Sequence, residues 1–158
     1  MKVSTRSRYG LRALVELATS GDTDDKHGSA CVTLKTIAER HGMSEYYLEQ
    51  LFAPLKKSGL VTSVRGARGG YRLNKPPDKV TAGDVLRILE GSLSPVDCLE
   101  DDGALCASAN CENCSTKPVW ERLYAGMSTV LDTITLSDLA GGTQEGGDEH
   151  AKQHSHIS

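Results

Sequence analysis

The stretch "TLKTIAERHGMSEYYLEQLFAPLKKSG", residues 33–59, decides the fold because its pattern predicts two short helices joined by a tight turn. Thr33 can cap the first helix, and Ser44 can cap the second. Between them, Gly42 can adopt the left-handed conformation that ends the first helix. The pattern fits either a helix-turn-helix or an ordinary helical hairpin.

Apolar residues at helical spacing extend this prediction. In the second helix, Leu48, Leu51 and Leu55 fall on one face, and the small Ala38 lets the two helices cross closely. Upstream, "RYGLRALVELATS" (8–20) predicts another helix. Aromatic residues make up only 4% of the 158-residue chain, so a mainly α-helical unit with an aliphatic core is expected.

A predicted β-hairpin follows in "LVTSVRGARGGYRL", residues 60–73. Its glycines permit a tight loop from which Arg65 and Arg68 project. A phosphate-binding nucleotide loop is a poorer fit, because the Lys-Ser/Thr pair of a P-loop is missing. The hairpin therefore favours a winged helix-turn-helix DNA-binding domain over residues 1–80.

The charge distribution supports contact with DNA. Residues 1–85 hold 14 Lys and Arg against 9 Asp and Glu, a net charge of +5, whereas residues 86–158 hold 4 against 12, a net charge of −8. The slender guanidinium groups of Arg65 and Arg68 can enter a narrow minor groove, where the negative potential is enhanced.

The outward face of the second helix in residues 33–59 supplies candidate base-reading side chains. Gln50 can pair with adenine, and Glu49 can accept a hydrogen bond from cytosine N4. Ser44 and Tyr46 can bond to phosphates or base edges. Each of these residues fits equally well as an ordinary solvated helix position.

Residues 81–97 are predicted to form a connecting helix and linker, opened by a capping box of Thr81 and Asp84. A hydrophilic segment, 98–114, then carries four cysteines in a C-x7-C-x4-C-x2-C arrangement: Cys98, Cys106, Cys111 and Cys114. The segment has almost no apolar residues to fold around, so an external group must order it. Thiolates select iron–sulfur clusters, zinc or copper(I). Zinc sites usually combine two tight ligand pairs, and only Cys111 and Cys114 form one, so the spacing favours a cluster.

Beyond the cysteines, residues 115–140 are predicted to form one long helix, with Thr116 as its cap and Pro118 in its first turn. Its apolar stripe is too long for so small a domain to cover fully, which favours pairing with a second copy of the chain over packing within its own chain alone. The stripe comprises Trp120, Leu123, Met127, Val130, Leu131 and Ile134. The glycine-rich tail, 141–158, is predicted to be disordered.

No apolar run approaches the roughly 20 residues that span a bilayer, so we expect a cytoplasmic protein without a membrane partner. In the reducing cytosol, closely spaced cysteines are metal ligands or redox sensors more often than disulfides. No nucleophile–base motif is present, and we expect no enzymatic activity.

Taken together, the motifs resemble the IscR-type winged-helix regulators of the Rrf-two family, which are bacterial transcription factors. The resemblance rests on "STRSRYGLRALVELA", "SEYYLEQLFAPLKKSGLVTSVRGARGGYRL", "CSTKPVW" and "ITLSDL". It implies a homodimer, paired by the long helix, that binds a palindromic operator. It also implies an iron–sulfur cluster in the cysteine segment, which senses iron, cluster supply, nitric oxide or redox state.

Individual roles carry over by motif. The resemblance implies operator contacts for Glu49, Gln50 and Arg65, and cluster ligation for the three loop cysteines that match, namely Cys98, Cys106 and Cys114. The histidine that supplies the family's fourth ligand is replaced by Lys117. Cys111 is additional and can take that place, so a 2Fe–2S and a 4Fe–4S cluster both remain open, as does repression or activation by either state.

Two other functions fit parts of the sequence. A zinc-structured or thiol-based regulator keeps the DNA-binding module and changes the sensor. A small iron–sulfur electron carrier keeps the cluster, and its basic half docks an acidic partner without reading DNA sequence.

Overall fold

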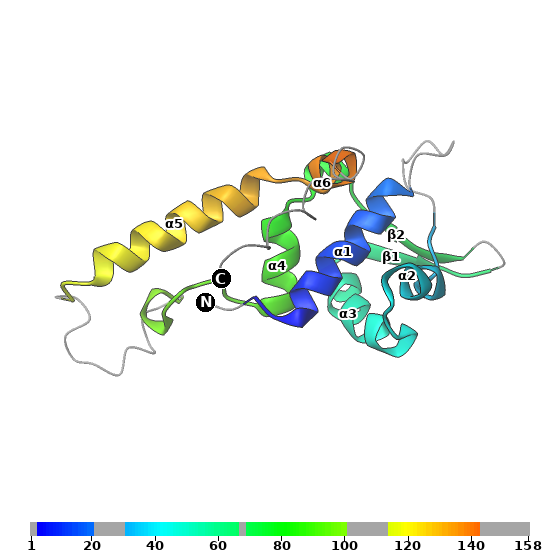
Figure 1. Ribbon diagram of the computed structural model, residues 1–158, viewed down its shortest axis with the longest axis horizontal. Helices are drawn as coiled ribbons and strands as arrows, with labels where there is room; N and C mark the ends of the chain where they lie inside the picture. Colours follow the sequence, from blue (N-terminus) through cyan, green and yellow to red (C-terminus); the bar gives the residue numbers. More distant parts are fainter. Residues whose placement is uncertain (1–2, 21–30, 67–68, 101–113, 143–158) are drawn as a thin grey trace, which may run out of the picture.

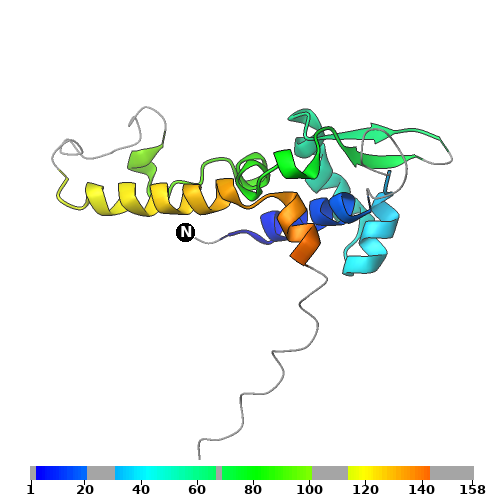
Figure 2. The same cartoon turned by 90° about the horizontal axis from the view of Figure 1, so that it is seen from above.

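The structure, a computed structural model, describes residues 3–20, 31–66, 69–100 and 114–142 (Figures 1 and 2). A winged unit comes first in the chain, and a long helix extends away from it in both views. In chain order the elements are α1 (Thr5–Thr19), α2 (Leu34–His41), α3 (Glu45–Lys57), β1 (Val61–Val64), β2 (Gly70–Leu73), η1 (Pro77–Lys79), α4 (Ala82–Glu90), η2 (Asp97–Leu99), α5 (Lys117–Thr133) and α6 (Leu136–Gly142).

Side-chain caps set the limits of α2 and α3. The Thr33 hydroxyl accepts a hydrogen bond from the backbone N–H of Thr36 at 3.1 Å, and Ser44 accepts one from Tyr47 at 3.1 Å. Gly42 ends α2 with a φ of 62°, a conformation that costs glycine little. The predicted helix-turn-helix and its three punctuating residues are confirmed.

The core of the winged unit is aliphatic, as expected, with one ring at its centre. Leu48, Leu51 and Leu55 of α3 are at most 1% exposed, and Leu14 of α1 is fully buried. Phe52 is also fully buried and meets the ring of Tyr71, on β2, edge to face with a centroid distance of 4.8 Å. These contacts hold the helices against the hairpin.

The hairpin is antiparallel and pairs Val61 with Leu73 through Val64 with Gly70. Its second strand is also tied to the segment before α2, because Val32 and Tyr71 exchange backbone hydrogen bonds of 2.9 and 2.8 Å. This short bridge fixes the wing relative to the helix-turn-helix. The predicted winged helix-turn-helix fold is thus present.

α4 begins with the predicted capping box, in which Thr81 and Asp84 exchange hydrogen bonds of 3.1 Å each. Val85 and Leu89 on its inner face belong to the same apolar core as α1 and α3. α4 is therefore an integral helix of the winged unit as well as the start of the connection to α5.

The sequence predicts one helix across 115–140, whereas the structure has two. α5 ends at Thr133, Ile134 is extended, and Thr135 opens α6 by exchanging hydrogen bonds with Asp138. A second capping box thus interrupts the apolar stripe. Thr116 does occupy the N-cap position of α5, as predicted, but its side chain makes no capping hydrogen bond.

α6 turns back onto the winged unit, where it packs against α1 and η1 (Figure 2). Its first residue, Leu136, is fully buried in the core. None of the described helices combines the length and the apolar character needed to cross a membrane. The predicted disordered tail lies outside the described residues from position 143 onward.

Candidate nucleic-acid interface and cysteine segment

The outer face of α3 is free of contacts with the core. Tyr46 is 72% exposed, and Glu49 and Gln50 are also exposed. These three predicted DNA contacts therefore share one accessible face of a helix whose other face is locked in the core. Ser44 lies just before them, and its hydroxyl oxygen already accepts the cap bond, which leaves its hydrogen to donate to a phosphate.

The wing carries the predicted arginine. Arg65 follows β1 directly and is exposed. Arg68 lies outside the described residues, so its role in DNA binding stays a prediction.

Lys56 is a positioning residue that the sequence analysis missed. It lies in the last turn of α3, and its Nζ donates to Ser63 Oγ on β1 at 2.7 Å. The contact joins the end of the helix-turn-helix to the base of the wing. From sequence, a lysine in the last turn of a helix is explained by the helix dipole alone, which concealed this second role.

Two of the four predicted cysteine ligands are described. Cys98 is half-buried in η2, Cys114 is exposed just before α5, and both are free thiols. Cys106 and Cys111 lie outside the described residues. Among the residues that the structure does describe, no three His, Cys, Asp or Glu side chains are grouped to hold a metal.

Cys114 has a distinctive electrostatic environment. The Thr116 hydroxyl lies 3.2 Å from its Sγ and can donate to it. This hydroxyl, followed by the backbone N–H groups of Thr116 and Lys117, lowers the pKa of Cys114 below its ordinary value. The side chain predicted to cap α5 instead stabilises a thiolate at the start of that helix.

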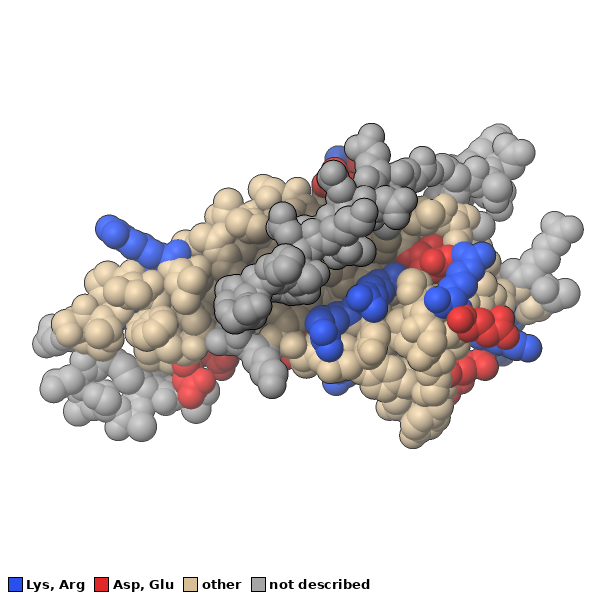
Figure 3. Space-filling view, in the orientation of Figure 1, with Lys and Arg blue, Asp and Glu red and all other residues tan. Residues whose placement is uncertain are grey.

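α5 exposes an apolar surface. No residue of this helix is buried, and Val119, Leu123 and Val130 are 60%, 51% and 56% exposed. Spacings of four and seven residues put them on one face, which we call the outer stripe. In Figure 3 the visible surface over α5 is mostly uncharged, whereas Lys, Arg, Asp and Glu side chains intermingle over the winged unit.

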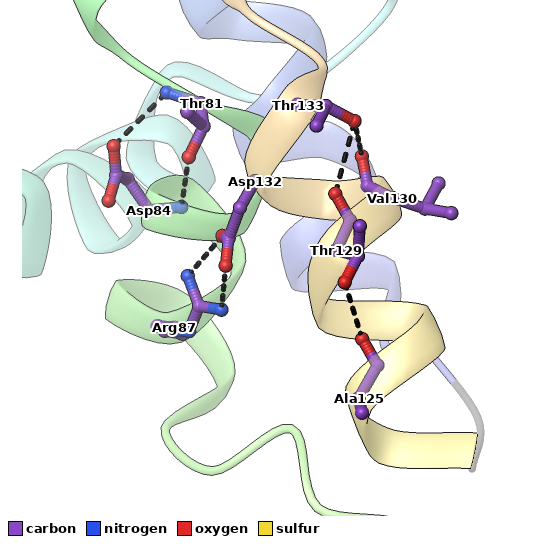
Figure 4. Close-up of polar contacts among 8 residues, drawn as sticks. All are labelled: Thr81, Asp84, Arg87, Ala125, Thr129, Val130, Asp132 and Thr133. Atoms are coloured by element: carbon purple, nitrogen blue, oxygen red, sulfur yellow. Dashed lines mark hydrogen bonds and ion pairs between the residues drawn. The ribbon is translucent and has the colours of Figure 1, made fainter. Parts of the chain in front are cut away.

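Threonine hydroxyls near the C-terminal end of α5 are satisfied within the helix. Thr129 donates to the carbonyl of Ala125 at 2.9 Å, and Thr133 donates to that of Thr129 at 3.0 Å (Figure 4). Covering this part of α5 would therefore leave these donors paired.

Residues 3–142 match the Rrf2 family (written Rrf-two above), which is described as an iron-dependent transcriptional regulator. The chain belongs to this family. It is 46% identical over 143 residues to the HTH-type transcriptional regulator CymR of Bacillus subtilis strain 168, covering 90% of this chain and 92% of CymR.

Solved structures of Rrf2 regulators agree with the fold. B. subtilis CymR, described as the global cysteine regulator of that organism, gives a TM-score of 0.70 at 44% identity, over 90% of this chain and 98% of CymR. T. potens IscR gives a TM-score of 0.71 at 41% identity, over 96% of this chain and 94% of IscR.

These findings confirm several expectations. The chain is a winged-helix transcriptional regulator of the Rrf2 family, whose regulators bind DNA, and it is not an enzyme. The electron-carrier alternative finds no support, because the relatives are regulators of transcription.

Proposed function

We propose that this Rrf2 regulator is a cytoplasmic homodimer whose affinity for a palindromic operator depends on an iron–sulfur cluster held by the cysteine segment. Cys98, Cys106 and Cys114 would bind the cluster, with Cys111 as the fourth ligand in place of the family's histidine. The observation that carries the proposal is the environment of Cys114, just before α5, which favours a thiolate.

The donor set fits the group. A metal ligand of this kind must be deprotonated, and the lowered pKa of Cys114 favours that form. η2, the short turn that contains Cys98, lies beside the N-terminal part of α5 in both views (Figures 1 and 2). When bound, a cluster would supply one-electron redox chemistry. It would also link its cysteine ligands rigidly, and oxidants could break that link.

The position of the segment connects sensing to DNA binding. Residues 98–114 run from the end of the winged unit to the start of α5. Ligation at both ends would restrain the N-terminal end of α5 relative to η2. A change in operator affinity then requires that one arrangement of the two winged units fits the operator better than the other.

The outer stripe of α5 is the proposed dimer contact. Val119, Leu123 and Val130 would be buried against the same helix of a second copy, a self-complementary arrangement with twofold symmetry. The α3 helices of two copies held this way would act as recognition helices and enter successive major grooves of one operator, about 34 Å apart.

A thiol-based regulator is the second candidate. The exposed, thiolate-prone Cys114 also fits direct oxidation. The similarity to CymR, described as a global cysteine regulator, favours this version independently. In this version the protein is still a dimer that binds an operator. Its sensor is the cysteine thiols themselves, or a zinc ion that they bind, in place of a cluster.

Metal analysis of anaerobically purified protein separates these candidates. We expect a brown protein with visible absorption that contains iron and acid-labile sulfide. Cys106→Ser and Cys114→Ser should lose both, and Cys111→Ser reports whether that thiol is the fourth ligand. Cys31→Ser is the matched control, because this cysteine lies beside the wing bridge, outside the segment, and its loss should leave iron unchanged. Colourless, iron-free or zinc-loaded protein would overturn the cluster proposal.

A mobility-shift titration tests the DNA contact. The probe is the fragment upstream of the protein's own gene, and the protein is compared with Arg65→Ala. We expect a loss of about tenfold or more in affinity, the usual cost of a base or groove arginine. Arg122→Ala removes an equal charge from exposed α5 and should bind like the unmodified protein.

A further inference from the structure

The only described contact in which two charged side chains bridge α4 and α5 is made by Arg87 and Asp132. Arg87 donates from Nη1 to Asp132 Oδ1 at 2.6 Å and from Nη2 to Oδ2 at 2.9 Å (Figure 4). Two parallel hydrogen bonds fix orientation as well as distance. Both side chains are more than a third exposed, so the pair contributes geometry more than stability.

Gly83 makes room for this pair. It is buried on α4, and a Cβ built there would overlap Asp132 Oδ1 and lie 2.7 Å from Arg87 Nη1. A side chain at this position would force the Asp132 carboxylate, the Arg87 guanidinium or both to shift from these positions. The bidentate geometry of this pair therefore depends on the absence of a side chain at position 83.

A backbone bridge lies beside the pair. Ala82 donates to the carbonyl of Ile134 at 2.8 Å, and Leu136 donates to that of Val80 at 2.8 Å. This reciprocal exchange brings Thr81 and Thr135 opposite each other, and each of these threonines opens a capping box. The same short pattern, "VTAGD" (80–84) and "ITLSD" (134–138), thus forms both halves of the connection.

The connection is confined to one end of α5. Val80 and Leu136 anchor it in the core with no exposure, whereas no residue of α5 itself is buried. These two backbone hydrogen bonds keep the two segments close together, but alone they would still allow α5 to rotate relative to the winged unit. The bidentate pair is a second attachment between the same two segments, and two separate attachments oppose a rotation that the bridge alone would permit.

We propose that Arg87, Asp132 and Gly83 are positioning residues that fix the angle between the winged unit and α5, and that this angle selects the separation of the two operator half-sites. The inference rests on the proposed dimerisation through α5. With 15 residues, α1 gives the winged unit a length of about 22 Å. A rotation of about 10° moves an atom at that distance by roughly 4 Å, about one base-pair step of 3.4 Å.

Operators with altered spacing test the proposal. Half-sites are mapped by footprinting on the fragment upstream of the protein's own gene, and duplexes are made with one or two base pairs added to or removed from the spacer. Unmodified protein should prefer one spacing at least tenfold. Arg87→Lys keeps the charge but loses the fork, and we expect its preference to fall below about threefold.

Coupling between the partners gives a second readout. Asp132→Asn should flatten the spacing profile as Arg87→Lys does, and the double variant should match either single one, because all three lack the same contact. Glu121→Gln is the matched control: it removes an ion pair of 3.9 Å to Lys117 that lies within α5 alone, and it should keep the original profile.

The outcomes separate the inference from the proposed function. A uniform loss of affinity at every spacing in Arg87→Lys would indicate a merely structural role and overturn the inference. Sedimentation of the unmodified protein reports the dimer independently. A monomer, or a protein with no spacing preference, would refute the proposed dimeric reader and the positioning role with it, whereas a dimer with an unchanged profile in Arg87→Lys refutes the positioning role alone.

Discussion

The winged unit and α5 both carry large apolar side chains, but the winged unit buries them and α5 leaves several of them exposed. Leu14, Leu48 and Phe52 are fully buried in the winged unit, whereas Leu123, on α5, is 51% exposed. The free energy that holds the monomer together therefore comes from the winged unit. The apolar surface of α5 becomes useful only when something outside the chain covers it.

The two regions also differ in how they are fixed. The helices of the winged unit are constrained by caps, by the Val32–Tyr71 bridge and by the packing of their inner faces in one core. α5 is constrained at its C-terminal end, by the backbone bridge and by the Arg87–Asp132 pair. The winged unit therefore specifies the fold of the chain, and α5 is free to serve the arrangement of two copies that we propose.

The largest expected effect comes from the centre of the winged unit. Phe52→Ala would leave a cavity beside Tyr71 and lower the free energy of unfolding by about 3–5 kcal/mol. Chemical denaturation followed by far-UV circular dichroism measures this change. A loss below about 1 kcal/mol would contradict the assignment of the core to this ring.

A charge on the outer stripe should have little effect on the free energy of unfolding of the monomer and a large effect on the dissociation constant of the proposed dimer. Leu123→Asp would force a carboxylate into the proposed contact between copies, which we expect to cost about 2–3 kcal/mol, or roughly a 100-fold weaker dimer. Sedimentation velocity over a concentration series measures the dissociation constant.

The matched control for that variant lies on the same helix. Ala125→Asp introduces an equal charge at another exposed position, about 200° around α5 from Leu123. It should dimerise like the unmodified protein. Equal weakening by both variants would mean that the outer stripe is not the contact.

Much of the winged unit could be predicted because its signals are local. Thr33, Gly42 and Ser44 act within one turn of their own positions, and the leucine spacing of α3 reports one buried face directly. The glycines that follow Arg65 likewise marked the wing. In each case the residue that gives the signal and the backbone group or turn that needs it lie within a few positions of each other in the sequence.

The prediction of one helix across 115–140 failed for a complementary reason. The apolar stripe continues through Ile134 without a break, and Thr135 and Asp138 read equally well as polar positions on a continuous helix. The break between α5 and α6 combines the capping box of Thr135 and Asp138 with a backbone exchange with Val80 and Ala82, residues more than 50 positions earlier in the chain. Such a partner is invisible to local periodicity, and so were Lys56 with Ser63 and Arg87 with Asp132.

Replacing glycine by alanine should lower stability in the winged unit and raise it in α5. Gly42→Ala would place a Cβ on a residue with a φ of 62° and lower the free energy of unfolding by about 1 kcal/mol. Gly126, in the interior of α5, has open space around it, and Gly126→Ala should stabilise that helix by about 0.5–1 kcal/mol.

Both glycine variants are best measured by thermal unfolding in the Leu123→Asp background, where α5 is unpaired. Destabilisation by Gly126→Ala in that background would show that α5 packs on its own chain at this point, contrary to the exposed helix described above.

The smallest expected effect lies at the junction of the two regions and depends on pH. The Arg87 hydrogen bonds, and then its charge, lower the pKa of Asp132. A carboxylate with a lowered folded pKa stabilises the folded state above its unfolded pKa of about 3.9 and loses that contribution as the pH falls through the folded value. The contribution is under about 1 kcal/mol, because both side chains are more than a third exposed and screened by water.

We therefore expect Asp132→Asn to reduce the slope of unfolding free energy against pH only below about pH 4, measured by urea denaturation at low salt. Since Arg87 is the cause, Asp132→Asn should add nothing in an Arg87→Met background. A slope that changes equally in both backgrounds would locate the acid sensitivity elsewhere, for instance at Asp138, whose pKa is lowered by the Thr135 hydroxyl and backbone N–H. The acid dependence would then belong to the capping box that starts α6, and the junction of α4 with α5 would be set by the backbone bridge alone.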